Sequence, residues 1–305
     1  NLSATQKSSA SAKAVAAILV AGCMWGVVGF FVRYLNGLGY NLLTIVFVRM
    51  SLAFVILAAV LLAMGRRGLF RIKPKDLWCF IGAGVSSAIM LNLFFSMSIV
   101  MNPLSFAAIL LATAPIFVVL ISAVLFRERL TSVKIQALVI AFAGAVLTSG
   151  IVGSVVSFSA KGFAIGLLAG FGYALYSIFS RFALNRGYDA LTVNLYSFFI
   201  AGVVCAPFTD FAVIAGSLAA ATLPMAAILL LHTLFASLLP YVLYTYGMQY
   251  IDTGKAAILV SVEPIAATAL GLVLYGEVPS VVAIVGIALV LFAITLLNLP
   301  KSNSM

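Results

Sequence analysis

Charged side chains are scarce in this sequence. They make up 8% of its 305 residues, against roughly 25% in ordinary soluble domains. Apolar residues make up 65%, and the mean hydropathy is +1.25. A soluble chain of this length cannot bury so much apolar surface in one core, so lipid must be the solvent for much of it.

Cysteine and histidine are scarce too. Cys23, Cys79 and Cys205 lie in apolar runs without a CxxC pair, and His232 is the single histidine. This pattern argues against a disulfide framework and against a zinc site. We therefore predict no metal and no cofactor. The sequence also has no GxSxG motif and no pair of acidic metal ligands within a helix, so we expect no catalytic residues and no enzyme.

Long apolar runs fill most of the chain. Each run is close to the twenty residues that cross about 30 Å of hydrocarbon as an α-helix. The continuous runs differ from the short alternating segments of membrane β-barrels. We predict an all-α membrane protein with ten transmembrane helices, at residues 14–34, 42–63, 77–99, 104–125, 133–152, 160–182, 190–212, 223–247, 255–276 and 281–299.

The basic residues predict the orientation. When the ten runs alternate across the membrane, fourteen Lys and Arg residues fall on the side of the N-terminus, and only Arg33 and Lys161 fall on the other. The positive-inside rule then makes both termini cytoplasmic, in a multi-pass protein of the bacterial inner membrane. The net charge of +10 is explained in this way, and no contiguous basic, aromatic-bearing surface indicates nucleic acid.

The two halves of the chain resemble each other. Residues 107–110 (AAIL) recur as residues 256–259, an offset of 149. The same offset relates Pro115 to Pro264 and Glu128 to Glu277, and an offset of 148 relates Trp25 to Tyr173. Matching apolar residues in the two halves can arise by chance in such a chain. A proline and a glutamate that match at the same offset indicate a duplication.

Each half contains five predicted helices, an odd number, so the second half enters the membrane from the opposite side. The prediction is therefore two inverted five-helix repeats, an arrangement that recurs in secondary transporters. A duplication without alternating access stays open. We expect a mobile N-terminal tail at 1–13, the first repeat at 14–152, the second at 153–299 and a C-terminal tail at 300–305.

The runs at 107–148 and 256–295 resemble the two EamA-type domains of the drug/metabolite transporter superfamily. Each has an AAxL start, a mid-helix proline (Pro115, Pro264), a glutamate at the helix end (Glu128, Glu277) and a further apolar helix. The Trp25-Gly26 pair of the first run also fits. The resemblance implies ten helices, cytoplasmic termini and export of amino acids or other small metabolites. The chain looks most like the aromatic amino-acid exporters.

Three ionisable side chains within the runs are candidate substrate-binding residues. Arg49 could meet a carboxylate or extend to the outer headgroups, since a charge at membrane depth is costly. Glu263 is the only acidic residue well inside a helix, and it could bind an ammonium group, carry a coupling proton or bond to backbone near Pro264. His232 could line a cavity or simply pack.

Aromatic residues gather on the helices expected to face the centre. Tyrosine combines an apolar ring with a hydroxyl, which suits a small amphipathic solute. An interfacial belt is the alternative, and it explains Tyr246 and Tyr250 better than the mid-helix positions. The aromatic residues of these helices include Phe94 and Tyr241, and the candidate substrate-binding residues are Trp25, Phe95, Tyr173, Tyr176 and Tyr244.

Two prolines and a row of glycines are expected to shape the helices. Pro115 and Pro264 each remove a backbone hydrogen bond, so we predict a hinge or gating role, with simple packing as the alternative. Gly162, Gly166 and Gly170 recur every fourth residue and should let another helix approach closely.

The sequence predicts an exporter of small metabolites, amino acids in particular, that works by alternating access. Its expected partners are the small-molecule substrate, the lipid bilayer and a candidate coupling proton. A phosphorylated metabolite or nucleotide sugar, as related families carry, would need two or more cavity cations. A channel, a receptor and an intramembrane enzyme are the alternatives from other classes.

Overall fold

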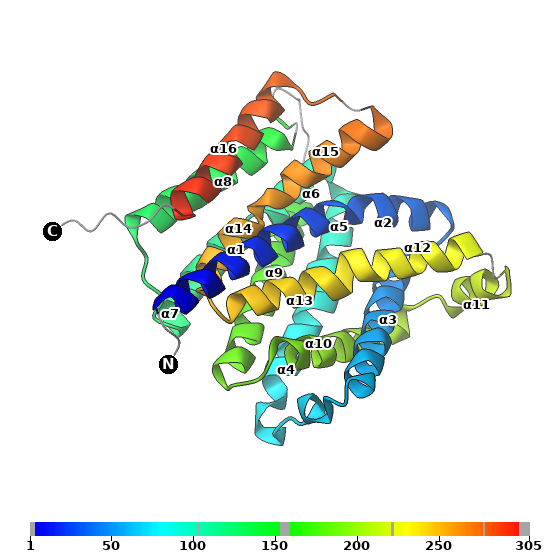
Figure 1. The fold of residues 1–305 in the computed structure, drawn as a ribbon. Coiled ribbons are helices and arrows are strands. Elements are labelled where there is room, and N and C mark those ends of the chain that lie inside the picture. Colours follow the sequence, from blue (N-terminus) through cyan, green and yellow to red (C-terminus); the bar gives the residue numbers. More distant parts are fainter. Residues whose placement is uncertain are drawn as a thin grey trace.

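The computed structural model describes residues 4–102, 104–149, 151–152, 159–220, 223–276 and 278–298. Every regular element within these ranges is helical (Figure 1). Nine of the described helices are long and apolar enough to cross a membrane, and Ser132–Thr148 is a shorter apolar helix. The predicted all-α fold with ten membrane helices is therefore confirmed.

The first half begins with a helix that starts at Ala4, inside the segment where we expected a tail. Asn41 begins the second membrane helix because its side chain accepts a hydrogen bond from the Thr44 N–H group. The helices are α1 (Ala4–Gly26), α2 (Val28–Gly37), α3 (Leu42–Ala63), η1 (Arg67–Phe70), η2 (Pro74–Asp76), α4 (Leu77–Val85), η3 (Ser86–Leu93), α5 (Phe94–Met101), α6 (Leu104–Leu111), α7 (Ala114–Leu125) and α8 (Ser132–Thr148).

The second half contains one short helix that we did not predict. The run at 190–212 is not one helix, because the chain turns at Pro207 and a new helix begins at Phe211, with Asp210 accepting the N–H groups of Ala212 and Val213. The helices are α9 (Ala160–Asn185), α10 (Ala190–Cys205), η4 (Ala206–Phe208), α11 (Phe211–Ala220), α12 (Leu223–Thr233), η5 (Leu234–Leu238), α13 (Leu239–Met248), α14 (Thr253–Leu259), η6 (Val260–Val262), α15 (Glu263–Tyr275) and α16 (Val281–Asn298).

Several membrane helices are interrupted, and the interruptions correspond between the halves. The third and eighth membrane helices contain the π-helical segments η3 and η5, and Ser86 of η3 corresponds to Phe235 of η5 at the offset of 149. The fourth and ninth are broken before Pro115 and Pro264, each the second residue of a new helix. Proline has no N–H group to continue the preceding helix, so it fits this position.

The first helix of each half packs against the other half. Helix α1 packs on α13, α15 and η6, whereas α9 packs on α5, α6 and η3. Glycines allow this contact: Gly22 meets Val260 and Val262, and its counterpart Gly170 meets Leu110 and Thr113. The remaining repeat mates pair directly, α3 with α10 and α8 with α16, so the two halves interlock (Figure 1).

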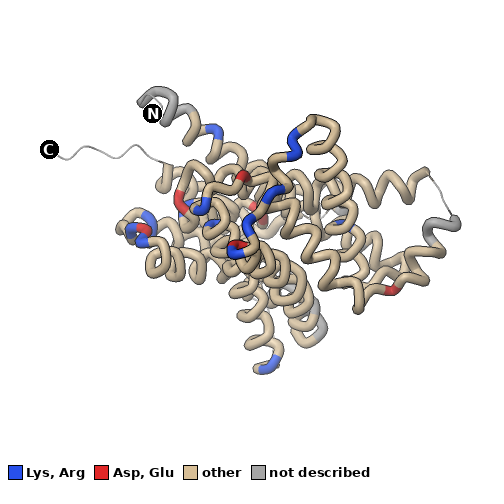
Figure 2. Tube along the Cα trace, turned by 90° about the horizontal axis from the view of Figure 1, so that it is seen from below, with Lys and Arg blue, Asp and Glu red and all other residues tan. Residues whose placement is uncertain are grey.

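The loops at 64–76, 126–131, 186–189 and 249–252 meet at one end of the bundle, which we call the basic end. Contacts between loops define it: the Tyr188 hydroxyl donates to Asp76 Oδ2 at 2.8 Å, and Arg186 pairs with Asp76 at 3.0 Å. Elsewhere charges are rare, as the mostly tan tube of Figure 2 shows. The loops at 38–41 and 209–210 and the chain around Asn102 and Ser159 belong to the opposite end.

Candidate functional site

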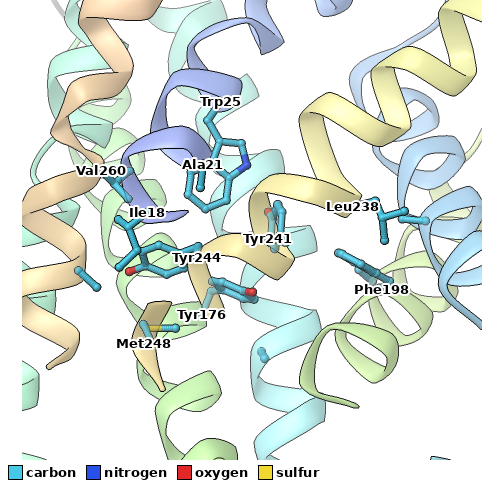
Figure 3. Packing of buried hydrophobic residues seen from close by; sticks show 14 of the residues in the cluster. Ile18, Ala21, Trp25, Tyr176, Phe198, Leu238, Tyr241, Tyr244, Met248 and Val260 are labelled. Carbon is cyan, nitrogen blue, oxygen red and sulfur yellow. The ribbon is translucent and has the colours of Figure 1, made fainter. Parts of the chain in front are cut away.

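An aromatic cluster lies at the centre of the bundle. The Trp25 ring of α1 is 6.0 Å from Tyr173, 5.2 Å from Tyr241 and 5.5 Å from Tyr244, measured between ring centroids. Tyr176 of α9 adds an edge contact to Tyr241 at 5.0 Å. Figure 3 shows the rings of Trp25, Tyr176, Tyr241 and Tyr244 gathered between α1, α9 and α13. We call Trp25, Tyr173, Tyr176, Tyr241 and Tyr244 the aromatic cluster.

Polar neighbours satisfy several hydroxyls of the aromatic cluster. The Tyr244 hydroxyl lies 2.9 Å from Ser177 Oγ, and the Tyr241 hydroxyl lies 3.2 Å from Ser87 Oγ. The Tyr176 hydroxyl donates to Asn194 Oδ1 at 3.2 Å. Buried hydroxyls need such partners, and they hold each ring in a fixed orientation. The cluster therefore presents ordered apolar faces with polar rims.

The structure brings four predicted site residues together in this cluster: Trp25, Tyr173, Tyr176 and Tyr244. Tyr241 contacts the Trp25 and Tyr176 rings, and our predicted set omitted it. Its position three residues before Tyr244, on the same helix face, was the signal. Phe95 is half-buried in α5, and the described ring contacts of the cluster do not include it. Tyr246 packs instead on Tyr250, at 5.1 Å.

Arg49 is buried in α3 and contacts both π-helical segments. Its Nη2 donates to Asn92 Oδ1 of η3 at 2.9 Å, and its Nη1 reaches the Ala236 carbonyl of η5 at 3.5 Å. Asn92 in turn donates to the Ser87 carbonyl, next to Tyr241. Arg49 is 6% exposed, and its Nε has no hydrogen-bond partner. Within the described part of the chain, no carboxylate forms an ion pair with Arg49.

Two further predicted site residues lie near this centre. His232, at the end of α12, is buried against the Phe31 ring at 5.3 Å, and its Nε2 has no partner. It interacts electrostatically with Arg49. Glu263 is the first residue of α15, half-buried beside Gly26, and it interacts electrostatically with Tyr173. An acidic and a basic side chain thus approach the aromatic cluster from different helices.

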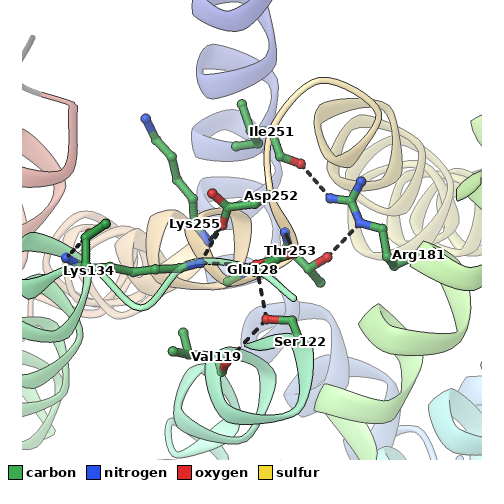
Figure 4. A network of polar contacts seen from close by, with 11 residues as sticks. Val119, Ser122, Glu128, Lys134, Arg181, Ile251, Asp252, Thr253 and Lys255 are labelled. Atoms are coloured by element: carbon green, nitrogen blue, oxygen red, sulfur yellow. Dashed lines mark hydrogen bonds and ion pairs between the residues drawn. The ribbon is translucent and has the colours of Figure 1, made fainter. Parts of the chain in front are cut away.

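A polar latch closes the basic end beneath the aromatic cluster. The Glu128 carboxylate, in the loop before α8, accepts the N–H groups of Thr253 and Gly254 at 2.7 and 3.0 Å. It also pairs with Lys134 at 3.1 Å (Figure 4). Burial alone would raise the pKa of the Glu128 carboxyl, but these backbone donors and the Lys134 ammonium outweigh burial and lower that pKa to about 2.

The latch joins the two halves at several points. Lys134 of α8 also pairs with Asp252 at 2.7 Å, and Asp252 accepts the N–H group of Lys255 at the start of α14. From α9, the Arg181 guanidinium donates to Thr253 Oγ1 at 2.6 Å and to the Ile251 carbonyl at 2.5 Å. We call Glu128, Lys134, Arg181, Asp252 and Thr253 the basic-end latch. Its repeat counterpart would involve Glu277, which lies outside the described residues.

The repeated helix interruptions, the interlocked halves and the buried central cluster indicate a family of transporters. The sequence profile of the EamA-like transporter family matches residues 12–150 and 160–299. The chain belongs to the EamA-like transporter family. It is a multi-pass membrane transporter, as the sequence predicted, and the two profile matches correspond to the two repeats.

Curated EamA-like relatives cover most of the chain. A probable terminal-alkyne amino-acid exporter of Streptantibioticus cattleyicolor is 27% identical over 264 residues, 85% of either chain. The uncharacterized transporter YxxF of Bacillus subtilis is 25% identical over 296 residues, 95% of this chain and 89% of its own. An uncharacterized transporter of Archaeoglobus fulgidus is 25% identical over 238 residues, 78% of this chain and 82% of its own.

A solved crystal structure has the same fold. It matches 94% of this chain and 96% of its own chain with a TM-score of 0.76, at 17% sequence identity. Among the described residues of this EamA-like chain, no three His, Cys, Asp or Glu side chains gather as metal ligands. The described site consists of the aromatic cluster together with Arg49, His232 and Glu263.

Proposed function

We propose that this transporter exports amino acids with apolar side chains by alternating access, from a bacterial cytoplasm across the inner membrane. One observation carries the proposal: the aromatic cluster is approached by Arg49 from α3 and by Glu263 from α15. A zwitterion carries a carboxylate and an ammonium, which match these two charges. Its apolar side chain would lie against the rings.

The rings would favour bulky apolar side chains. Removing apolar surface from water contributes about 25 cal/mol per Å2, so a phenyl group gains more than a methyl group. A transporter must also release its substrate, so moderate affinity suits the task. The relative from Streptantibioticus cattleyicolor, named a probable amino-acid exporter, supports this substrate class.

The basic-end latch serves as the inner gate in this mechanism. The basic residues at that end make it cytoplasmic by the positive-inside rule, which also places both termini in the cytoplasm. When the latch opens, substrate enters from the cytoplasm, and when it closes, the opposite end releases the substrate. Pro115 and Pro264 would act as hinges, because both begin a new helix at an interruption.

Glu263 is the candidate carrier of a coupling proton. It is the acidic side chain of the described membrane helices that reaches the aromatic cluster. Glu263→Gln keeps the shape and removes the charge, so proton-coupled flux should lose its pH dependence. Flux with an unchanged pH profile in reconstituted vesicles would make Glu263 structural.

A flux panel in reconstituted liposomes tests the substrate class. Phenylalanine, leucine, glycine and a sugar phosphate would be compared in counterflow. We expect phenylalanine and leucine to be carried, and Trp25→Ala or Tyr244→Ala to slow them by roughly tenfold, or about 1.4 kcal/mol. Trp78→Ala and Tyr250→Ala, at exposed aromatic positions, are the matched controls and should keep the parent rate.

The same flux panel distinguishes amino acids from phosphorylated metabolites, the alternative substrate class. Flux of the sugar phosphate alone would reject the amino-acid proposal. A phosphorylated solute would need at least two cations, and Arg49 is the buried cation that the structure describes beside the cluster. Folded Trp25→Ala and Tyr244→Ala proteins that carry phenylalanine at the parent rate would place the pocket elsewhere.

A further inference from the structure

We propose that Arg49 binds the carboxylate of the transported amino acid, and that this contact replaces the link from Arg49 to η5. The inference rests on the proposed function for the class of its ligand. It adds a recognition residue and a way for substrate binding to alter the two halves differently.

The guanidinium is incompletely satisfied where it lies. Its Nη2 makes one good hydrogen bond, to Asn92 Oδ1 at 2.9 Å, while the Nη1 contact to Ala236 is long at 3.5 Å and Nε has no partner. A buried guanidinium without an anion is costly in a membrane. Its planar donor edge fits both oxygens of a carboxylate, which would supply the missing charge and the missing acceptor.

Two further polar atoms, on the segment that contacts Arg49 through the Ala236 carbonyl, are buried without partners. Ser237 Oγ belongs to the residue after Ala236, and His232 Nε2 belongs to the residue one helical turn before Ala236. The His232 ring also interacts electrostatically with Arg49. A hydroxyl and a neutral imidazole can each donate a hydrogen bond to a carboxylate. Thus α3 and the α12–η5 segment packed against it carry three unsatisfied polar groups, which favour an anionic ligand beside Arg49.

A carboxylate at this place would change what Arg49 holds. The empty transporter links Arg49 to η3 through Asn92 and to η5 through the Ala236 carbonyl. The ligand competes for the weaker of these contacts, so η5 is released while η3 stays bound. Because η3 and η5 belong to opposite repeats, substrate binding would affect the two halves unequally. A ligand shifts a conformational equilibrium only through such differential contacts.

The test compares phenylalanine with phenylalaninamide, which keeps the ring and the amine and lacks the carboxylate. Thermal stabilisation of the purified full-length chain reports binding. We expect the parent to prefer phenylalanine by roughly tenfold to a hundredfold, the worth of a charge-assisted hydrogen bond. Arg49→Gln should abolish the preference, and Lys161→Gln, an exposed cation at the opposite end, should retain it.

Hydrogen exchange tests the link to η5. Phenylalanine should reduce the protection of peptides covering residues 234–238 in the parent and leave them unchanged in Arg49→Gln. Unchanged protection in the parent, with the preference intact, would overturn the link. A folded Arg49→Gln protein that still prefers phenylalanine would overturn the carboxylate site.

Two outcomes need a second measurement. If Arg49→Gln does not fold, Arg49→Lys decides, because the ammonium keeps the charge and loses the planar fork. The preference of Arg49→Lys for phenylalanine over phenylalaninamide should be smaller than that of the parent. An equal preference would overturn the carboxylate site at Arg49. If the parent binds neither amino-acid ligand, the proposed function fails. Phenylacetate and phenylacetamide then test the site alone, and equal stabilisation of the parent by both would overturn it.

Discussion

The two ends of the bundle are held by different chemistry. All three ion pairs that the structure describes lie at the basic end: Lys134 with Glu128, Lys134 with Asp252, and Arg186 with Asp76. At the opposite end, two of the described contacts between helices are neutral. Ser98 Oγ donates to the Gly162 carbonyl at 3.1 Å, and the Ser159 N–H group donates to Asn102 Oδ1 at 3.0 Å.

Among the described contacts, charged groups thus hold the basic end, and neutral groups contribute at the opposite end. Removing one partner of a buried charge pair costs more than removing a neutral hydrogen bond, because the other charge is left unmatched. In the described chain the basic end therefore depends on a few residues, Glu128 above all. The neutral contacts at the opposite end can break and reform at lower cost.

The largest expected effect concerns the side of the membrane on which each end lies, because a cysteine at either end is labelled from one side only. In a cysteine-free background, Arg67→Cys at the basic end and Asn36→Cys at the opposite end should label from different sides of the membrane. An impermeant thiol reagent added to intact cells should reach only the Asn36→Cys protein. Labelling of both proteins would contradict the inverted-repeat topology.

Glu128→Gln should open the basic end. The substitution removes the charge that pairs with Lys134 and weakens the bonds from Thr253 and Gly254. A cysteine replacing Ser177, beside Tyr244, should then react roughly tenfold faster from the cytoplasmic side, the effect of losing a charge-assisted hydrogen bond. Asp210→Asn at the opposite end is the control. Equal rates in parent and Glu128→Gln would show that the latch is not a gate.

The basic end should respond to acid. The Glu128 pKa is lowered from 4.5 to about 2 in the folded chain. A lowered carboxyl pKa gives stability above pH 4.5 that is lost progressively as the pH falls towards 2. Thermal unfolding in detergent should show this loss in the parent, and Glu128→Gln should lack that component. If the melting temperatures of the two proteins fell equally with pH, Glu128 would not be the group whose pKa is lowered by folding.

Asn102→Ala should give the smallest effect. It removes the acceptor of the Ser159 N–H group at the opposite end, and a neutral hydrogen bond contributes about 1 kcal/mol. We expect a small loss of thermal stability and no change in the reactivity of the Ser177→Cys reporter. If the Ser177→Cys reporter reacted as fast in Asn102→Ala as in Glu128→Gln, the two ends would not differ in how they are held closed.

The fold could be read from the sequence because lipid demands long apolar helices. The predicted runs and the structure agree closely, for example 42–63 against α3 at Leu42–Ala63. The predicted helix at 190–212 was too long. Its apolar residues continue through Pro207 into α11, so composition alone did not show where the helix ends. Periodicity likewise could not reveal the π-helical segments η3 and η5, which are set by tertiary contacts.

The site was only partly predictable. The repeat offset identified Trp25 and Tyr173, and the structure places their rings in contact. The partners of Arg49 could not be found, because one is a backbone carbonyl 187 residues away. Glu128 stood out as a repeated residue, but the N–H groups that bind it carry no sequence signal. Backbone partners become visible only when the chain is folded.

The interlocked packing of α1 and α9 has a consequence for biosynthesis. Helix α1 is synthesised well before Val260 and Val262, the residues that cover its Gly22. Arg49 is likewise synthesised long before Ala236 of η5, whose carbonyl it contacts. During synthesis the helices of the first repeat therefore lack these partners. We expect the packing of α1 and α3 to be completed only after the helices of the second repeat are made.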